Sequence, residues 1–151
     1  MMRIGIAGTQ STEIIEKSVK ETLSDSGFES FHFKNNSKTL TADLVIVLGG
    51  DRGVRNYFHH ALDVDTPVLG ISESESNAFL AQIELKELSM YLKRIKEQNY
   101  IIENVPRIGV KIDGKDVYPV LNDVAVFTSK SATLMEHVLR INDEEVWHDS
   151  S

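Results

Sequence analysis

The sequence predicts an α/β protein in which a parallel sheet is followed by antiparallel strands, and three observations support this expectation. Short β-branched runs alternate with helical periodicity over the first 100 residues. The run at residues 44–48 is apolar throughout, which is typical of a central parallel strand covered on both faces. After about residue 99, strand-like runs follow one another without a helix between them. We therefore expect an open, mostly parallel, Rossmann-like sheet with helices on both faces, followed by antiparallel strands that begin an incomplete all-β domain.

The elements of the first part are predicted from local periodicity. A strand at residues 3–7 precedes a helix that Ser11 or Thr12 can cap and that ends at Gly27. Apolar residues recur every four positions in this helix, at Ile15, Val19 and Leu23. Further elements are expected in this order: a partly exposed strand at 28–33, the central strand at 44–48, a helix at 51–62, a buried strand at 67–71 and a helix at 85–95.

The last third of the chain consists of strand-like runs. These runs lie at residues 105–112, 117–127 and 134–141. Asp113-Gly114 is a good hairpin turn between the first two. We therefore expect an α/β domain at residues 1–100, and at residues 101–151 antiparallel strands leading into a second β domain that is missing or truncated.

Composition excludes several classes of protein. The 151 residues carry 16 Lys and Arg against 23 Asp and Glu, a formal net charge of −7, and no cysteine. Disulfide scaffolds, thiolate zinc sites and cysteine nucleophiles are excluded, and the acidic balance argues against a partner nucleic acid. We expect no membrane segment and a cytoplasmic location, because no apolar run approaches about 18 residues.

His59 and His60 are neighbours on a predicted helix, so we expect them at the surface or partly packed, and we expect no metal site.

The turn after the central strand has an unusual composition. Gly49-Gly50-Asp51 follows that strand directly, and open α/β sheets bind ligands beyond the carboxyl ends of their strands. Adjacent glycines allow close approach of a phosphate to backbone N–H groups at a helix start. Asp51 has the chemistry of a general base, a helix cap or a metal ligand. A tight turn with Asp51 as a helix cap explains the same residues equally well.

Three segments in the same order resemble NAD kinases. Residues 44–51 are similar to the strand and Gly-Gly-Asp-Gly loop of that family, residues 67–71 to its Pro-hydrophobic-Leu-Gly-Ile strand, and residues 121–126 to its Leu-Asn-Glu/Asp-hydrophobic segment. The resemblance implies phosphorylation of the adenosine 2′-hydroxyl of NAD to give NADP, with ATP or polyphosphate as donor and Mg²⁺ accompanying ATP. It also implies small-molecule nucleotides as partners and a homo-oligomer for the complete protein.

The resemblance also implies roles for individual residues. Asp51 falls at the position of the catalytic aspartate, as the base or the orienting group for the 2′-hydroxyl. Gly49 and Gly50 belong to the loop near the phosphates, and Asn122 and Asp123 fall where the family contacts NAD. A side-chain amide and a carboxylate suit ribose hydroxyl groups, since the amide both donates and accepts hydrogen bonds. For Asn122 and Asp123 alone, a turn or bulge beside a strand remains the alternative.

Two loops depart from the family pattern. Arg52 replaces a glycine, and it either supplies a positive charge to a phosphate or fills the pocket. Ser72 replaces the usual Asn of a second loop that contains no glycine here, and Phe79 corresponds to the aromatic residue that packs near the adenine. Glu73 and Glu75 place negative charges beside the expected phosphate site, which is unfavourable unless a cation intervenes.

These observations leave three interpretations. We expect the N-terminal portion of an NAD kinase-like protein, with little or no activity in this piece alone because the Thr-Pro-x-Gly-Ser/Thr segment of the family is absent. The alternative is a diverged, non-catalytic nucleotide- or ligand-binding regulatory domain with the same fold. A signalling receiver domain ranks last, because the first strand ends in Ala7-Gly8-Thr9 and lacks the acidic pair such domains need.

Overall fold

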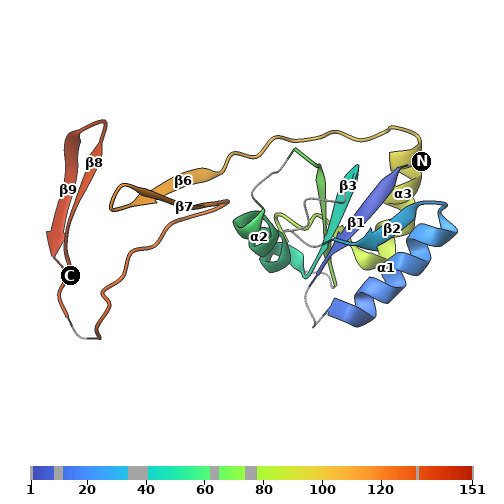
Figure 1. The fold of residues 1–151 in the computed structure, drawn as a ribbon, viewed down its shortest axis with the longest axis horizontal. Helices are drawn as coiled ribbons and strands as arrows, with labels where there is room; N and C mark the ends of the chain where they lie inside the picture. The colour runs from blue at the N-terminus through green and yellow to red at the C-terminus, as the bar shows by residue number, and fades with distance from the viewer. Residues whose placement is uncertain are drawn as a thin grey trace.

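A five-stranded parallel sheet forms the first part of the molecule (Figure 1). The computed structural model describes residues 2–8, 12–33, 41–61, 65–73, 78–131 and 133–150. The strands are β1 (Arg3–Ala7), β2 (Glu29–His32), β3 (Leu44–Leu48), β4 (Val68–Ser72) and β5 (Ile83–Glu84). Their order in the sheet is β2-β1-β3-β4-β5, and every neighbouring pair is parallel. All five residues of β3 are buried, which confirms the prediction of a central strand.

Helices cover both faces of this sheet, as the sequence predicts. On one face, α1 (Glu13–Asp25) and α3 (Leu88–Lys96) pack against the side chains of Ile4, Ile6 and Ile46. On the other face, α2 (Gly50–His60) packs against Val45 and Val47. Successive residues of a strand point to opposite faces, so β3 contributes to both cores. Figure 1 shows α2 separated by the sheet from α1 and α3.

Two antiparallel hairpins follow the sheet. The first joins β6 (Ile108–Ile112) to β7 (Lys115–Val120), and the second joins β8 (Glu136–Ile141) to β9 (Glu144–Ser150). The predicted turn at Asp113-Gly114 is confirmed, with φ of +50° and +75°. Figure 1 places the second hairpin at the end of the molecule far from α1 and α3.

The structure corrects some element boundaries. Strand β5 has only two residues, too few to show a period, and the sequence analysis missed it. Strand β9 was also missed, although Asn142 and Asp143 form its turn with positive φ, a conformation that these residue types tolerate. The strand expected at 117–127 ends at Val120, because no described strand pairs with residues 121–127. The helix expected from residue 85 begins with a 3₁₀ turn, Leu85–Glu87.

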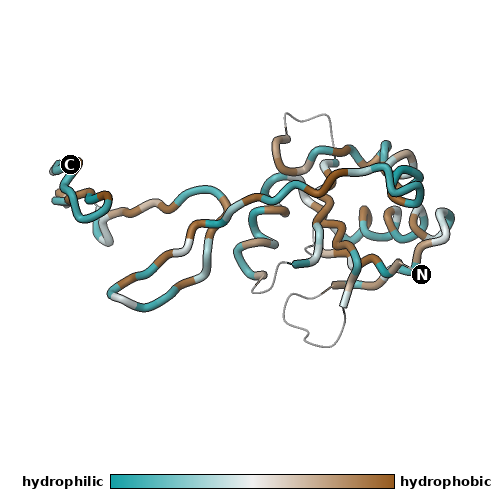
Figure 2. The backbone as a smooth tube through the Cα atoms, turned by 90° about the horizontal axis from the view of Figure 1, so that it is seen from above, coloured by the Kyte–Doolittle hydropathy of each residue, from teal (hydrophilic) through white to brown (hydrophobic). Residues whose placement is uncertain are grey.

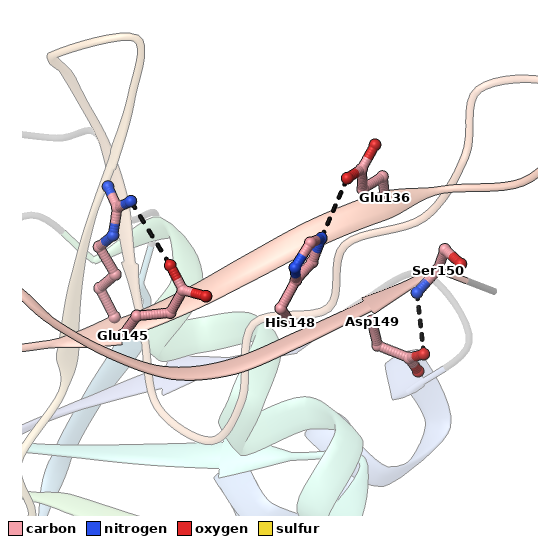
Figure 3. Close-up of polar contacts among 6 residues, drawn as sticks. Glu136, Glu145, His148, Asp149 and Ser150 are labelled. Carbon is pink, nitrogen blue, oxygen red and sulfur yellow. Dashed lines mark hydrogen bonds and ion pairs between the residues drawn. The ribbon is translucent and has the colours of Figure 1, made fainter.

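The hairpins bury little apolar surface. Figure 2 shows hydrophobic segments along both of them, and Val138, Leu139, Val146 and Trp147 are each about half exposed. Polar contacts join β8 to β9 across the second hairpin (Figure 3), including His148 to Glu136 at 3.0 Å and Arg140 to Glu145 at 3.7 Å. These solvent-exposed pairs contribute little stability on their own.

The first hairpin contacts the α/β part through α2. The Arg107 guanidinium donates hydrogen bonds to the carbonyl oxygens of Phe58 and Ala61, at 3.0 and 2.8 Å. The last carbonyl groups of a helix lack partners within the helix, so Arg107 caps the end of α2. Tyr118 of β7 lies 5.9 Å from His59 between ring centroids. These contacts fix the end of β7 beside α2.

Within the described part of the chain, no helix has the length and apolar character needed to span a bilayer.

Candidate functional site

Glycine residues bring the start of α2 close to the end of β3. Gly49 and Gly50 both have positive φ, +95° and +63°, and Gly49 is the N-cap residue of α2. A Cβ atom at Gly53 would collide with the carbonyl oxygen of Leu48, so no side chain fits there without a shift of the backbone. The turn therefore holds the first turn of α2 against the end of β3, and it leaves backbone N–H groups at the start of the helix.

The Asp51 carboxylate anchors the loop that precedes β5. It accepts hydrogen bonds from the backbone N–H groups of Phe79, Leu80 and Ala81, at 3.0, 2.8 and 2.9 Å. Gly70 of β4 allows this close packing, because a Cβ atom there would lie 2.9 Å from the Cα atom of Ala81. The predicted catalytic aspartate thus connects two segments that are about thirty residues apart.

These hydrogen bonds also set the charge of Asp51. The N–H groups of Ala81 and Phe79 hold the pKa of this carboxyl below its ordinary value, and the nearby Arg55 charge adds to the effect. A carboxylate with a lowered pKa stays ionised at neutral pH and accepts a proton reluctantly. Both carboxylate oxygens of Asp51 are engaged by these backbone N–H groups.

A pocket of about 790 Å³ lies between α2 and the end of β7. One helix wall presents Arg52, Arg55, Asn56 and His59. Arg52 and His59 each lie three or four residues from both Arg55 and Asn56, so the four side chains share one face of the helix. The segment Val120–Asp123 forms the opposite wall. The remaining lining residues are Thr12, Leu48, Gly49, Gly53 and Glu73.

Charges of both signs line this pocket. Arg52 and Arg55 contribute guanidinium groups, and neither forms a hydrogen bond or ion pair with a residue in the described part of the chain. Glu73 and Asp123 contribute carboxylates. The Asn122 side-chain amide donates to the Asp123 carboxylate at 2.7 Å, so these two residues orient each other. No group of three His, Asp or Glu side chains among the described residues is arranged to hold a metal ion.

The structure brings some of the predicted site residues together and leaves others apart. Gly49, Arg52, Asn122 and Asp123 all line the pocket. Gly50 and Asp51 lie next to it in the same turn without lining it. Ser72 is buried at the end of β4, with 6% of its surface exposed, and Phe79 is 81% exposed; neither side chain lines the pocket. Glu75 lies outside the described residues.

Several lining residues were missed by the sequence analysis. Arg55 and Asn56 were not considered, and His59 was expected only at the surface or partly packed. The available signal was the helical spacing of Arg52, Arg55 and His59, which places three potentially cationic groups on one face of α2. Only the tertiary structure places the end of β7 across the pocket from that face.

Comparisons with known proteins agree on one family. A family model described as ATP-NAD kinase N-terminal domain matches residues 6–100. An NAD kinase of Clostridium botulinum is 30% identical over 119 residues, which are 76% of this chain and 41% of the relative. An NAD kinase of Methanospirillum hungatei is 33% identical over 100 residues, which are 66% of this chain and 36% of the relative.

Solved structures share the fold. The crystal structure of an Archaeoglobus fulgidus NAD kinase in complex with ATP matches with a TM-score of 0.72 at 22% identity, covering 97% of this chain and 57% of that one. A yeast NADH kinase complexed with NADH matches with a TM-score of 0.72 at 14% identity, covering 98% and 55%. This chain therefore spans about half the length of these proteins.

Proposed function

Because this chain belongs to the NAD kinase family, as its match to the ATP-NAD kinase N-terminal domain over residues 6–100 shows, we propose that it is the N-terminal portion of an enzyme that phosphorylates the 2′-hydroxyl of NAD. One observation carries the proposal. The pocket joins the turn at Gly49 to Asn122 and Asp123, two of the segments whose sequences resemble the family. The product of the complete enzyme is NADP, and the donor is ATP or polyphosphate.

The proposal assigns a role to each part of the site. Asn122 and Asp123 bind hydroxyl groups of the NAD ribose, since an amide and a carboxylate together supply donors and acceptors. Asp51, held ionised by the loop before β5, orients the 2′-hydroxyl from the turn beside the pocket. Gly49 and Gly50 admit phosphate close to the backbone.

The other predicted residues have supporting roles in this proposal. Phe79 is exposed, which leaves its ring accessible for packing against adenine, and Ser72 is buried at the end of β4. Mg²⁺ accompanies ATP, and it prefers oxygen ligands. Glu73 is a carboxylate that lines the pocket and fits this preference.

We also propose the wider organisation. Residues 1–100 form the nucleotide-binding domain, and residues 101–151 lead into a second β domain; the extended, exposed segment 101–106 supports a boundary there. Because the chain spans only about half of its relatives, we propose that it has little or no kinase activity by itself. The complete protein is proposed to be a cytoplasmic homo-oligomer.

Nucleotide binding tests the proposal directly. Isothermal titration calorimetry of this chain with NAD and with ATP is expected to detect binding of both. Asn122→Ala is expected to weaken NAD binding about tenfold, the value of one good hydrogen-bonded contact. Asn99→Ala, in the exposed segment after α3, is the matched control and should bind like the wild type. Absence of binding for both nucleotides would contradict the proposal.

The second candidate is a non-catalytic regulatory domain with the same fold. Two observations favour it: the carboxylate of Asp51 is already engaged by three backbone N–H groups, and Arg52 occupies a position where the family has glycine. Formation of NADP by the longest protein that contains this sequence separates the two candidates. Loss of that activity in Asp51→Asn, with nucleotide binding retained, supports the enzyme and rules out the regulatory domain.

A further inference from the structure

We propose that Arg107 is a positioning residue of the candidate site. It holds the first hairpin against α2, so that Asn122 and Asp123 lie across the pocket from the turn at Gly49. Arg107 is not among the residues that line the pocket, and it acts through the segment that does. The inference rests on the proposed function only for the ligand, NAD, whose affinity reports the positioning.

The chain connection alone does not place the hairpin beside α2. Residues 101–106 belong to no helix or strand and are all exposed. Figure 1 shows them as an extended trace between α3 and β6. A connection of this length spans roughly 20 Å when extended, and each residue without regular structure has two soft backbone dihedrals. Contacts made by the hairpin itself must therefore fix its position.

Arg107 supplies such contacts where the connection ends. Its Nη1 donates hydrogen bonds to the carbonyl oxygens of Phe58 and Ala61, at 3.0 and 2.8 Å, and both are partly buried. The last carbonyl groups of a helix have no partner within the helix, and a cation is favoured at this end of the helix dipole. Hydrogen bonds from a charged donor are also stronger than neutral ones. Arg107 is therefore well suited to hold the hairpin at the end of α2.

The end of β7 continues this attachment toward the pocket. The Tyr118 ring lies 5.9 and 6.4 Å, between centroids, from the two imidazole rings at the end of α2. Leu121 is partly buried against the core on the α2 face of the sheet. Asn122 and Asp123 follow directly and line the pocket. The contacts thus extend from the C-terminal end of α2 to the pocket within one short segment.

Helix α2 connects the attachment to the candidate site. Gly49 caps its first turn, and carbonyl groups at its other end accept the hydrogen bonds of Arg107. A helix of 11 residues is only about 16 Å long, so a hairpin fixed at one end is held close to the other. When a site exists only in the docked arrangement, its apparent affinity falls with the docked fraction. Loss of Arg107 should therefore weaken nucleotide binding from outside the pocket.

A double-mutant cycle tests this positioning. Calorimetry is expected to show that Arg107→Met, which removes the side-chain donors, weakens NAD binding about tenfold. In an Asn122→Ala background, the same change is expected to cost less than about threefold, because one of the groups that Arg107 positions is gone. Equal losses in both backgrounds would indicate a general loss of stability and would overturn the inference.

Two further variants serve as rescue and control. Arg107→Lys is expected to retain most of the affinity, because an ammonium group, like Nη1, can donate to both carbonyl oxygens from one nitrogen. Arg140→Met removes the same charge from the second hairpin, where Arg140 forms only an exposed pair with Glu145, and it should bind NAD like the wild type. Equal weakening of NAD binding in Arg107→Met and Arg140→Met would mean that only net charge matters and would overturn the inference.

A distance measurement tests the positioning without a nucleotide. The chain has no cysteine, so Lys17→Cys on α1 and Lys115→Cys on β7, both exposed, provide two unique sites for spin labels. Double electron–electron resonance is expected to give one narrow distance distribution with Arg107 or Arg107→Lys and a broad one with Arg107→Met. Far-ultraviolet circular dichroism verifies that each variant is folded. A distribution that Arg107→Met leaves unchanged would overturn the inference.

The two measurements separate this inference from the proposed function. If the distance distribution broadens as expected but NAD does not bind to the wild type, the positioning by Arg107 stands and the proposed function fails. If NAD binds and Arg107→Met changes neither its affinity nor the distances, the proposed function stands and this inference fails. A broadened distribution with unchanged NAD affinity would also overturn it, since the pocket would then not depend on the docked hairpin.

Discussion

The carboxylate of Asp51 accepts a hydrogen bond from the backbone N–H of Ala81 at 2.9 Å, across thirty residues of sequence. The same oxygen accepts from Leu80 at 2.8 Å, and the second oxygen accepts from Phe79 at 3.0 Å. One side chain at the start of α2 therefore fixes the path of the loop that precedes β5. This anchoring is a structural function of Asp51, distinct from any role toward a substrate.

Asp51→Asn is expected to loosen this loop. An amide retains only one oxygen acceptor and no charge, so the N–H groups of residues 79–81 lose part of their hydrogen bonding. Amide hydrogen exchange of Leu80 and Ala81 is expected to accelerate on the order of tenfold, with the core of β3 unchanged. The control is Asp116→Asn, which changes an exposed aspartate on β7. Equal exchange rates of Leu80 and Ala81 in the wild type and in Asp51→Asn would show that the hydrogen bonds of Asp51 do not hold this loop.

Acid is expected to remove the stabilisation that Asp51 provides. Its pKa is lowered in the folded chain, so the ionised form favours folding above the unfolded pKa, and this contribution disappears as the pH falls through the folded pKa. The difference in free energy of unfolding between wild type and Asp51→Asn should be largest near neutral pH and should vanish at low pH. Urea denaturation between about pH 2 and pH 7 measures it.

The comparison with Asp51→Asn is needed because a second carboxyl titrates in the same range. Burial raises the pKa of Glu16, but hydrogen bonds from Lys20 and His32 outweigh this effect and the net pKa is lowered. The wild-type curve therefore contains both contributions. A difference between the two proteins that does not change with pH would contradict the assignment to Asp51.

Gly53→Ala is expected to destabilise the fold strongly. The added Cβ atom would collide with the carbonyl oxygen of Leu48, and relief requires moving α2 away from β3. We expect a loss of about 1–3 kcal/mol in the free energy of unfolding, as for other overpacked positions. Gly109→Ala on β6 is the matched control, because nothing lies within 4 Å of its added Cβ. Similar midpoints in thermal denaturation for the two variants would disprove the close contact.

Arg107→Gln is expected to weaken the attachment of the first hairpin. The substitution removes the hydrogen bonds to the carbonyl oxygens of Phe58 and Ala61, with an expected cost of about 1–2 kcal/mol. Faster amide exchange is expected at the end of α2 and along β7. Arg140→Gln, which removes only an exposed pair with Glu145, should leave both regions unchanged. Unchanged exchange in Arg107→Gln would mean that other contacts hold the hairpin.

Local patterns determined the fold class of this protein. The apolar run of β3, the four-residue spacing of Val19 and Leu23 and the Asp113-Gly114 turn each encode structure within a few residues. Such signals arise from side-chain periodicity and backbone preferences, which a single sequence displays directly. The two-residue strand β5 gave no period, and β9 was missed although its Asn142-Asp143 turn was visible in the sequence.

The site was only partly determined in this way. The Gly49-Gly50-Asp51 turn and Asn122-Asp123 were recognisable as motifs, but their distance in space was not. Only the tertiary structure placed the end of β7 opposite α2, and only it connected Asp51 to the loop at residues 79–81. The physical reason is that these contacts are between groups far apart in the chain, and many of them use backbone N–H and carbonyl groups that every residue possesses. The residue type therefore does not identify the partner of such a group. The packing of the helices and strands determines it.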